Sequence, residues 1–395
     1  MRKKFNVTFI RFYLARNLLR LTFMIFYVYY MWIIMVKYDS VFYVSMMPLS
    51  ALLGYLIIII PEGYILDKFR RDLIMFLSSI FIAINYFLLF FVKLLYFIYL
   101  IATISSILSN ISSDVFMTLI KDIVEEFNIN KSMSFIEAGR GLSEIIGILI
   151  GGISILILSK YFIPIMIILS LISAIFSYPN KKINKAVKIK SKYNYNNVIR
   201  IIRIIIGFLI LGMLINGLFV SLDVYASAIF YQYLHTKSFY YTLFLLDFSL
   251  GGFIGGLTGI KINKLIDSSY FISISIGIFG LSFLFLALSK YSYIDLILSG
   301  IIGLFSSLVN IPLNSRLLKI IPNEVLGRVN SIIVIFLTSS SPIMAVLFGS
   351  LSYFYSIPKI LTAVSLFLIA ISLPTYYYLR KIFSIDENLI REKMK

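Results

Sequence analysis

The chain has 395 residues, of which 60% are hydrophobic and only 14% are charged, and this composition excludes a water-soluble globular protein. Its formal net charge of +18 would suit a nucleic-acid-binding protein, but apolar stretches of about 20 residues recur along the chain and leave no room for a soluble domain. Cysteine is absent and histidine occurs once, so we expect no disulfide, no metal site and no cofactor.

Apolar runs between charged or turn-forming residues predict an all-α integral membrane protein with twelve transmembrane helices. In chain order, the first six are expected at residues 14–36, 42–60, 73–92, 95–120, 133–158 and 162–178. The last six are expected at 204–231, 239–262, 270–288, 293–318, 329–353 and 360–379. We therefore predict two six-helix halves, 1–180 and 204–380, with a basic cytoplasmic linker at 181–203 and a cytoplasmic tail at 381–395.

The distribution of Lys and Arg predicts the orientation of these helices, because cytoplasmic loops of membrane proteins are rich in both residues. Each odd-numbered connection contains a single lysine, whereas the termini and the even-numbered connections hold nearly all the other basic residues. Those six lysines are Lys37, Lys93, Lys160, Lys237, Lys290 and Lys359. The alternation predicts a multi-pass protein of the cell membrane with both termini in the cytoplasm, and it assigns the positive charge to topology and anionic lipid rather than to nucleic acid.

The two predicted halves share a weak sequence repeat with an offset of 196 residues. A glycine, a short polar residue and a lysine recur after the second helix of each half, and an acidic or amide residue recurs in the fourth helix. The matching pairs are Gly63 with Gly259, Asp67 with Asn263, Lys68 with Lys264, and Asp114 with Asn310.

At these residues the sequence resembles the major facilitator superfamily, whose signature between helices two and three is a glycine, then an aspartate, then a basic cluster. Gly63, Asp67, Lys68, Arg70 and Arg71 match that signature. The resemblance implies two six-helix halves that rock about a central site. It also implies that these residues, with their counterparts in the second half, form a cytoplasmic gate.

The segment PNEVLGRVNS at 322–331, followed by Pro342 and Gly349, is similar to the start of helix eleven in the efflux-type branch of the superfamily. Two features depart from that branch. The predicted fourth helix, 95–120, contains no arginine, and the fifth helix keeps its glycines, as in Gly147 and Gly151, without the proline that antiporters carry. The resemblance therefore favours proton-coupled export without requiring it.

Ionisable side chains inside a membrane usually face a cavity or a charged partner, because exposure to lipid costs about 2.5–3.5 kcal/mol each. Glu137, Arg140 and Glu144 share one face of the fifth helix, and Asp114 is expected at a similar depth in the fourth. We weigh a structural Asp114–Arg140 ion pair equally against a role in substrate binding or coupling.

Two further carboxylates, Asp223 and Asp247, are expected in the outer half of helices seven and eight without a basic partner. Such groups are candidates for proton coupling, and hydration in an outer vestibule is the alternative. Asn110, Asn216 and Asn310 are candidates for a substrate cavity, although hydrogen bonding between helices is the commoner use of such residues.

These features predict a secondary active transporter, functional as a monomer, that moves a small hydrophobic or amphipathic molecule by alternating access with protons as the coupling ion. An uptake symporter or a facilitator for a small metabolite is the first alternative. The second alternative is a membrane-embedded lipid-modifying enzyme or a sensor. The sequence disfavours the enzyme, because it has no DxxD-type motif and no histidine other than His235.

Overall fold

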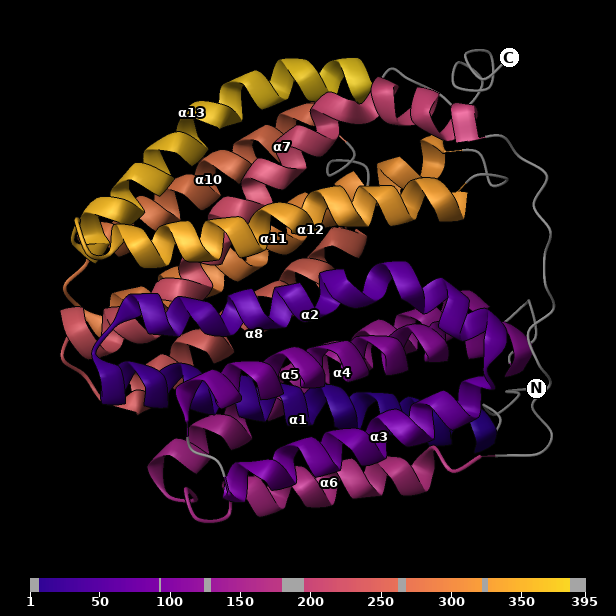
Figure 1. Ribbon diagram of the computed structural model, residues 1–395. Coiled ribbons are helices and arrows are strands. Elements are labelled where there is room, and N and C mark those ends of the chain that lie inside the picture. The colour runs from indigo at the N-terminus through magenta and orange to yellow at the C-terminus, as the bar shows by residue number, and fades with distance from the viewer. Residues whose placement is uncertain are drawn as a thin grey trace. The chain divides into compact units, whose positions relative to one another are not determined.

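The computed structural model describes residues 7–91, 94–123, 129–179, 195–261, 268–321 and 326–383. Within these ranges the chain forms twelve α-helices, one 3-10 turn and one π turn, and no strand (Figure 1). The prediction of a twelve-helix, all-α membrane protein is confirmed.

The helices of the first half coincide with the predicted apolar segments. They are α1 (Val7–Tyr38), α2 (Val41–Lys68), α3 (Arg71–Phe87) with the 3-10 turn η1 (Leu88–Phe90), α4 (Leu95–Ile123), α5 (Ile129–Leu156) and α6 (Phe162–Phe176). The first helix begins seven residues earlier than predicted, so Arg11 belongs to it together with Arg16 and Arg20.

The second half repeats this order. Its helices are α7 (Tyr195–Ala228), which ends in the π turn η3 (Ile229–Tyr233), α8 (Ser238–Lys261), α10 (Ser269–Leu288), α11 (Ser292–Ile320), α12 (Leu326–Leu351) and α13 (Ile357–Phe383). The start of α10 shows how the sequence sets a helix end, because the Ser268 side chain accepts a hydrogen bond from the Phe271 amide at 3.1 Å.

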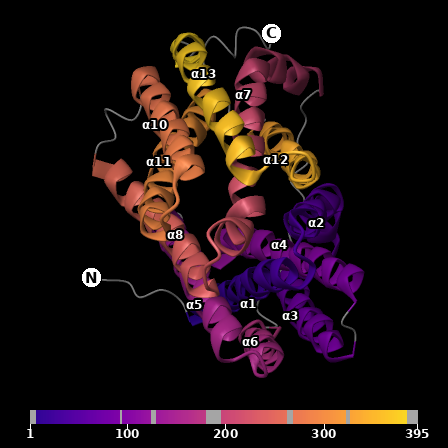
Figure 2. The same ribbon diagram turned by 90° about the vertical axis from the view of Figure 1, so that its left-hand side faces the viewer.

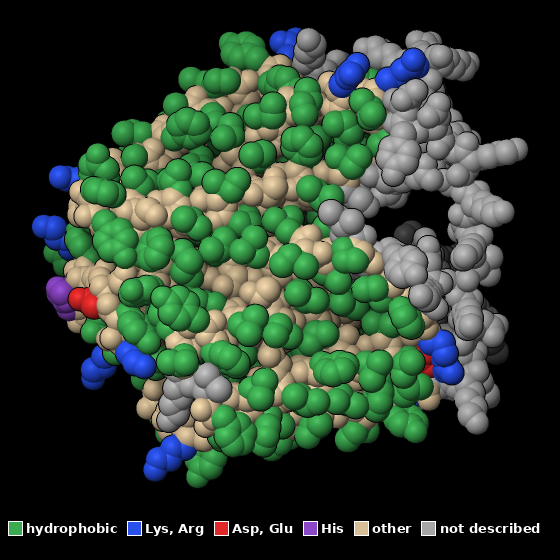
Figure 3. Space-filling model, viewed as in Figure 1, with side chains coloured by type: hydrophobic (Ala, Val, Ile, Leu, Met, Phe, Trp, Pro, Cys, Tyr) green, Lys and Arg blue, Asp and Glu red, His purple; other side chains and the backbone are tan. Residues whose placement is uncertain are grey.

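Among the described residues, eleven helices are long and apolar enough to cross a membrane, and α6 is a shorter apolar helix of 15 residues. Large hydrophobic side chains are exposed on many of them, among them Phe81, Ile168, Phe285 and Leu373. Figure 3 shows hydrophobic side chains covering the length of the helices on one face, with Lys and Arg near the helix ends. Such a surface is stable only in lipid, so the chain is a multi-pass membrane protein.

Contacts between residues divide the chain into two compact units. Unit 1 comprises Met1–Tyr38 and Met46–Ile189, and unit 2 comprises Asp39–Ser45 and Lys190–Lys395. The first turn of α2 therefore belongs to unit 2, where the Phe42 ring lies 5.7 Å from the Tyr353 ring.

The two units use the same helix pairs, which Figures 1 and 2 show for each unit. In unit 1, α1 packs on α5 and α6, and α3 packs on α4 and α6. In unit 2, α7 packs on α12 and α13, and α10 packs on α11 and α13. Each of these four contacts in the second unit is thus the counterpart of one in the first, as expected for a structural repeat.

Equivalent bonds give the offset between the two repeats. The Ser106 hydroxyl on α4 donates to the Ala51 carbonyl on α2 at 2.6 Å, and the Ser307 hydroxyl on α11 donates to the Gly252 carbonyl on α8 at 2.8 Å. These residues are 201 apart, so the offset of 196 read from the sequence is wrong for the middle of these helices. The difference of five residues exceeds one helical turn.

Candidate functional site

The first unit contains a polar face on α1 that the sequence analysis overlooked. Tyr13, Arg16, Asn17 and Arg20 are spaced three and four residues apart and therefore share one side of the helix. Gly139 on α5 leaves room for this face, because a Cβ atom at that position would overlap the side chains of Tyr13 and Asn17.

Arg20 pairs with Glu144 and so joins α1 to α5. Both its Nη2 and its Nε donate to one carboxylate oxygen, at 2.6 and 3.1 Å. The two side chains are 32% and 29% exposed, so the pair is half-buried. Glu144, which the sequence analysis placed in the intramembrane charge cluster, thus has its partner on α1.

Arg16 is more deeply buried, with 6% of its surface exposed. Its Nε donates to the Ser113 hydroxyl on α4 at 2.8 Å, and its guanidinium carbon lies 5.8 Å from the centroid of the Phe116 ring. The signal for both arginines was available in the sequence, since they are four residues apart within an apolar run. Both lie inside the predicted first helix, 14–36, but the sequence analysis did not single them out.

The rest of the predicted charge cluster is only partly described. Asp114 is half-buried on α4, next to Ser113, and Arg140 is exposed on α5. Both have interaction partners in the structure. The side chain of Glu137 lies outside the described residues, and the Asp114–Arg140 pair stays a prediction.

The predicted cytoplasmic gate motif ends in a charged pair at the start of α3. The Arg70 guanidinium donates to both carboxylate oxygens of Asp72, at 2.7 and 3.2 Å, and the Leu73 amide donates to Asp72 at 2.9 Å. The hydrogen bond and the charge of Asp72 raise the pKa of Arg70. Asp72 is fully buried, and the sequence analysis did not single it out.

The other motif residues are placed less completely. Arg71 is half-buried at the first position of α3, and Gly259 is buried in α8. The side chains of Gly63, Asp67 and Lys68, and the residues Asn263 and Lys264, lie outside what the structure describes. Their role as a gate remains a prediction.

In unit 2, Asp223 on α7 and Asp247 on α8 are half-buried inside membrane spans. Neither carboxylate forms an ion pair with a described residue. A third carboxylate, Asp295, lies in the first turn of α11 with 1% of its surface exposed. The sequence analysis did not single out Asp295, which lies at the start of the predicted helix 293–318.

A cavity of about 120 Å³ lies between α7, α10 and α11 in unit 2. It brings together two of the three asparagines predicted to line a substrate cavity, Asn216 and Asn310. The other lining residues are Ile215, Phe219, Ile276, Phe279, Ser306 and Val309. The third asparagine, Asn110, lies in unit 1 on α4.

Aromatic rings form one wall of this cavity. The Phe219 and Phe279 rings are stacked with centroids 5.3 Å apart and an interplanar angle of 7°, and Phe219 also contacts Phe248 on α8 at 5.5 Å. Asp223 follows Phe219 by one helical turn and so lies on the same side of α7, whereas the Cβ atom of Asp247 lies beside Gly300 on α11.

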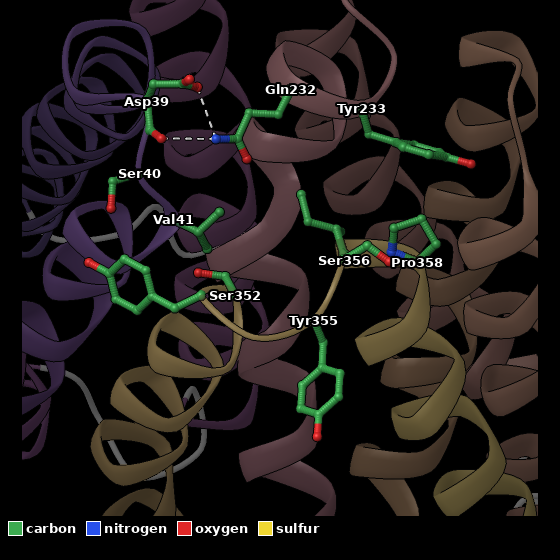
Figure 4. A pocket seen from close by; sticks show the side chains of 11 residues that line it. Asp39, Ser40, Val41, Gln232, Tyr233, Ser352, Tyr355, Ser356 and Pro358 are labelled. Atoms are coloured by element: carbon green, nitrogen blue, oxygen red, sulfur yellow. Dashed lines mark hydrogen bonds between the residues drawn. The ribbon is translucent and has the colours of Figure 1, made fainter.

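A larger cavity of about 330 Å³ lies at the ends of the helices in unit 2 (Figure 4). Gln232 donates from Nε2 to the backbone oxygen and to a carboxylate oxygen of Asp39, at 3.0 and 2.9 Å. Asp39, which has a left-handed backbone with φ of 47°, is exposed. This cavity lies beside the connection before α2 and the one before α13, so it is a vestibule at the helix ends and not a site within the spans.

Comparison with known proteins agrees with this arrangement. The profile of the Major Facilitator Superfamily matches residues 12–346. A mutant of the nucleoside transporter NupG is similar with a TM-score of 0.75 and 13% sequence identity, covering 96% of this chain and 100% of that one. No curated protein sequence matches at a significant level.

Two further solved structures share the fold. A POT family transporter in complex with a thioalcohol-conjugated peptide has a TM-score of 0.74 and 15% identity, covering 95% of this chain and 96% of that one. A bacterial homologue of the human lysosomal transporter Spinster, described as inward-facing and unoccupied, has a TM-score of 0.67 and 12% identity, covering 97% and 96%.

Proposed function

The chain belongs to the major facilitator superfamily, and on that premise we propose that it is a secondary active transporter for a small hydrophobic or amphipathic molecule. It works by alternating access, with residues 1–180 and 204–380 as the two moving halves. It lies in the cell membrane with both termini in the cytoplasm, functions as a monomer, and exports its substrate in exchange for protons, as in the efflux-type branch.

One observation supports this proposal above the others: the cavity of unit 2 combines an aromatic wall with two carboxamides inside membrane spans. A mostly apolar pocket with a few polar groups is the usual form of a site for small organic molecules. Unit 1 has a similar carboxamide in Asn110 on α4. Its Nδ2 donates to the Ser106 carbonyl, as the Nδ2 of Asn310 donates to the Ser306 carbonyl.

The position of the two carboxylates supports proton coupling. Asp223 and Asp247 have no cationic partner among the described residues, and Asp223 lies one helical turn from Phe219 in the cavity wall. A carboxylate in such a place can release a proton when the cavity opens to one side of the membrane and bind one when it opens to the other. Proton binding and substrate binding would then be coupled, because both would depend on the same conformational cycle.

The charged groups of unit 1 have a supporting role in this proposal. Glu144, Arg140, Asp114 and Glu137 hold the helices around the substrate path. The motif from Gly63 to Arg71, with Gly259, Asn263 and Lys264, opens and closes the cytoplasmic side. The Arg70–Asp72 pair anchors the start of α3 next to that motif.

The test is movement of a panel of lipophilic dyes and drugs into proteoliposomes under an imposed pH gradient. Antiport predicts accumulation when the vesicle interior is acidic, because protons leave as the compound enters. Symport predicts accumulation when the exterior is acidic. The polarity of the effective gradient therefore separates export by antiport from uptake by symport, whichever way the protein inserts.

Asp223→Asn and Asp247→Asn test the coupling sites in the same assay. We expect at least one of them to abolish gradient-driven movement while exchange without a gradient continues. Asp39→Asn, the same chemical change at an exposed carboxylate, is the matched control and should transport like the wild type. Full activity in both variants would move the coupling site to Asp114, Glu137 or Arg140, and no movement of any compound would contradict the proposal.

A further inference from the structure

The bonding of the two cavity asparagines indicates which part of each side chain is available to a ligand. Asn216 donates from Nδ2 to the Leu337 carbonyl on α12 at 3.3 Å, and Asn310 donates from Nδ2 to the Ser306 carbonyl at 3.0 Å. Since only the nitrogen of a carboxamide can donate, these bonds fix which atom is the oxygen. Neither oxygen accepts a hydrogen bond from a described residue, so both are acceptors that remain open.

Asn310 is not explained by helix packing. Among the residues that the structure describes, its amide bonds only to Ser306, one turn earlier in the same helix, and so joins no two of these helices. Polar side chains in membrane spans are retained where they bond between helices or face a polar ligand or water. Asn310 is exposed whereas Ile276 is 1% exposed, so the cavity extends from the surface of the unit into its interior.

The size of the cavity limits the ligand. An apolar cavity of about 150 Å³ holds one benzene molecule. The present cavity of about 120 Å³ is of that order and is open at its surface, so one six-membered ring fills its inner part and a second fused ring would project through the opening. The stacked rings of Phe219 and Phe279 offer an apolar wall for such a ring.

We propose that this cavity binds a single aromatic or heteroaromatic ring that carries an N–H or O–H donor, and that the oxygens of Asn216 and Asn310 select for that donor. The inference rests on the proposed transport function and names the substrate class of the same site. A site built to accept a hydrogen bond discriminates strongly against ligands that lack the donor, because its own polar group is then left unpaired.

The test is a ligand-observed NMR titration of the purified full chain in detergent micelles with three probes: benzamide, N,N-dimethylbenzamide and 2-naphthamide. We expect benzamide to bind about tenfold more tightly than the dimethyl compound, which has lost its N–H donors. The fused-ring probe should bind more weakly than benzamide, because only one of its rings can enter the inner part of the cavity. Ile276→Phe, which fills the cavity, supplies the background due to partitioning into detergent.

Variants then locate the effect. Asn310→Leu should remove the preference for benzamide, whereas Gly256→Ala should keep it, because a Cβ atom at Gly256 meets nothing within 4 Å. Equal binding of the two benzamides, tight binding of 2-naphthamide, no benzamide binding above the Ile276→Phe background, or an unchanged preference in Asn310→Leu would each overturn the inference. The wild-type comparison decides the question even if a variant fails to fold.

Failure of this inference is distinguishable from failure of the proposed function. Gradient-driven transport without selectivity for ring size or donor would overturn the inference and leave the transporter standing. Binding with the expected selectivity, but no gradient-driven movement of any compound, would do the reverse.

Discussion

At the scale of single residues, two arginines of α1 are tolerated in a membrane span because each has a partner on a neighbouring helix. Arg20 bonds to Glu144 on α5, and Arg16 bonds to Ser113 on α4. Removal of Glu144 would leave the charge of Arg20 without compensation, which costs more than the pair itself contributes.

The Arg20–Glu144 pair gives a prediction about stability. Glu144→Ala should lower the free energy of unfolding by about 1–2 kcal/mol, less than the 3–5 kcal/mol of a fully buried pair because both side chains are partly exposed. The double variant Arg20→Ala/Glu144→Ala should recover part of that loss. Unfolding in mixed micelles measures all four forms of the cycle, and Lys160→Ala, an exposed cation, is the control. Strictly additive losses would show that the pair has no coupling.

At the scale of helices, α8 and α11 approach so closely that glycine is required at their contact. A Cβ atom at Gly251 would overlap the backbone of Gly300, and one at Gly255 would lie 2.5 Å from the Leu304 carbonyl oxygen. The Gly54 position on α2 has the same relation to Thr103 on α4, at 2.6 Å. Small residues that permit close backbone contact are typical of helix pairs in membranes.

The close contact between α8 and α11 predicts opposite outcomes for two glycines of α8. Gly251→Ala should lower the free energy of unfolding by about 1–3 kcal/mol, because the added methyl group overlaps backbone atoms that cannot move aside easily. Gly256→Ala should leave stability unchanged or raise it by up to about 1 kcal/mol, since the site is open and alanine favours the helix. Equal effects of the two variants in thermal unfolding would show that the contact between α8 and α11 can accommodate an added methyl group.

At the scale of the whole molecule, the sequence predicted the helices well because membrane helices are defined by length and hydropathy, as for α4, expected at 95–120 and found at Leu95–Ile123. It did not predict the pairing of Arg20 with Glu144, since partners 124 residues apart leave no local signal. Asn216 and Asn310 were candidates for a cavity, but Phe219 and Phe279 could not be distinguished among 35 phenylalanines.

The repeat illustrates the same limit. The sequence match at an offset of 196 rests on short motifs at helix ends, whereas the offset of 201 follows from bonds in the middle of the helices. The position of a backbone contact depends on how the two helices pack. Glycine and serine residues permit such a contact, but they do not by themselves determine where it forms.

The most direct test of alternating access is the labelling of a single cysteine at Asn310 with a membrane-impermeant maleimide, which the chain allows because it has no cysteine of its own. The account predicts that Asn310→Cys in intact and in inverted vesicles is labelled from both sides of the membrane. Phe69→Cys, between α2 and α3, should be labelled only from the cytoplasmic side, and Tyr293→Cys, at the start of α11, only from the outside. Labelling of Asn310→Cys from one side alone under every gradient would contradict the account.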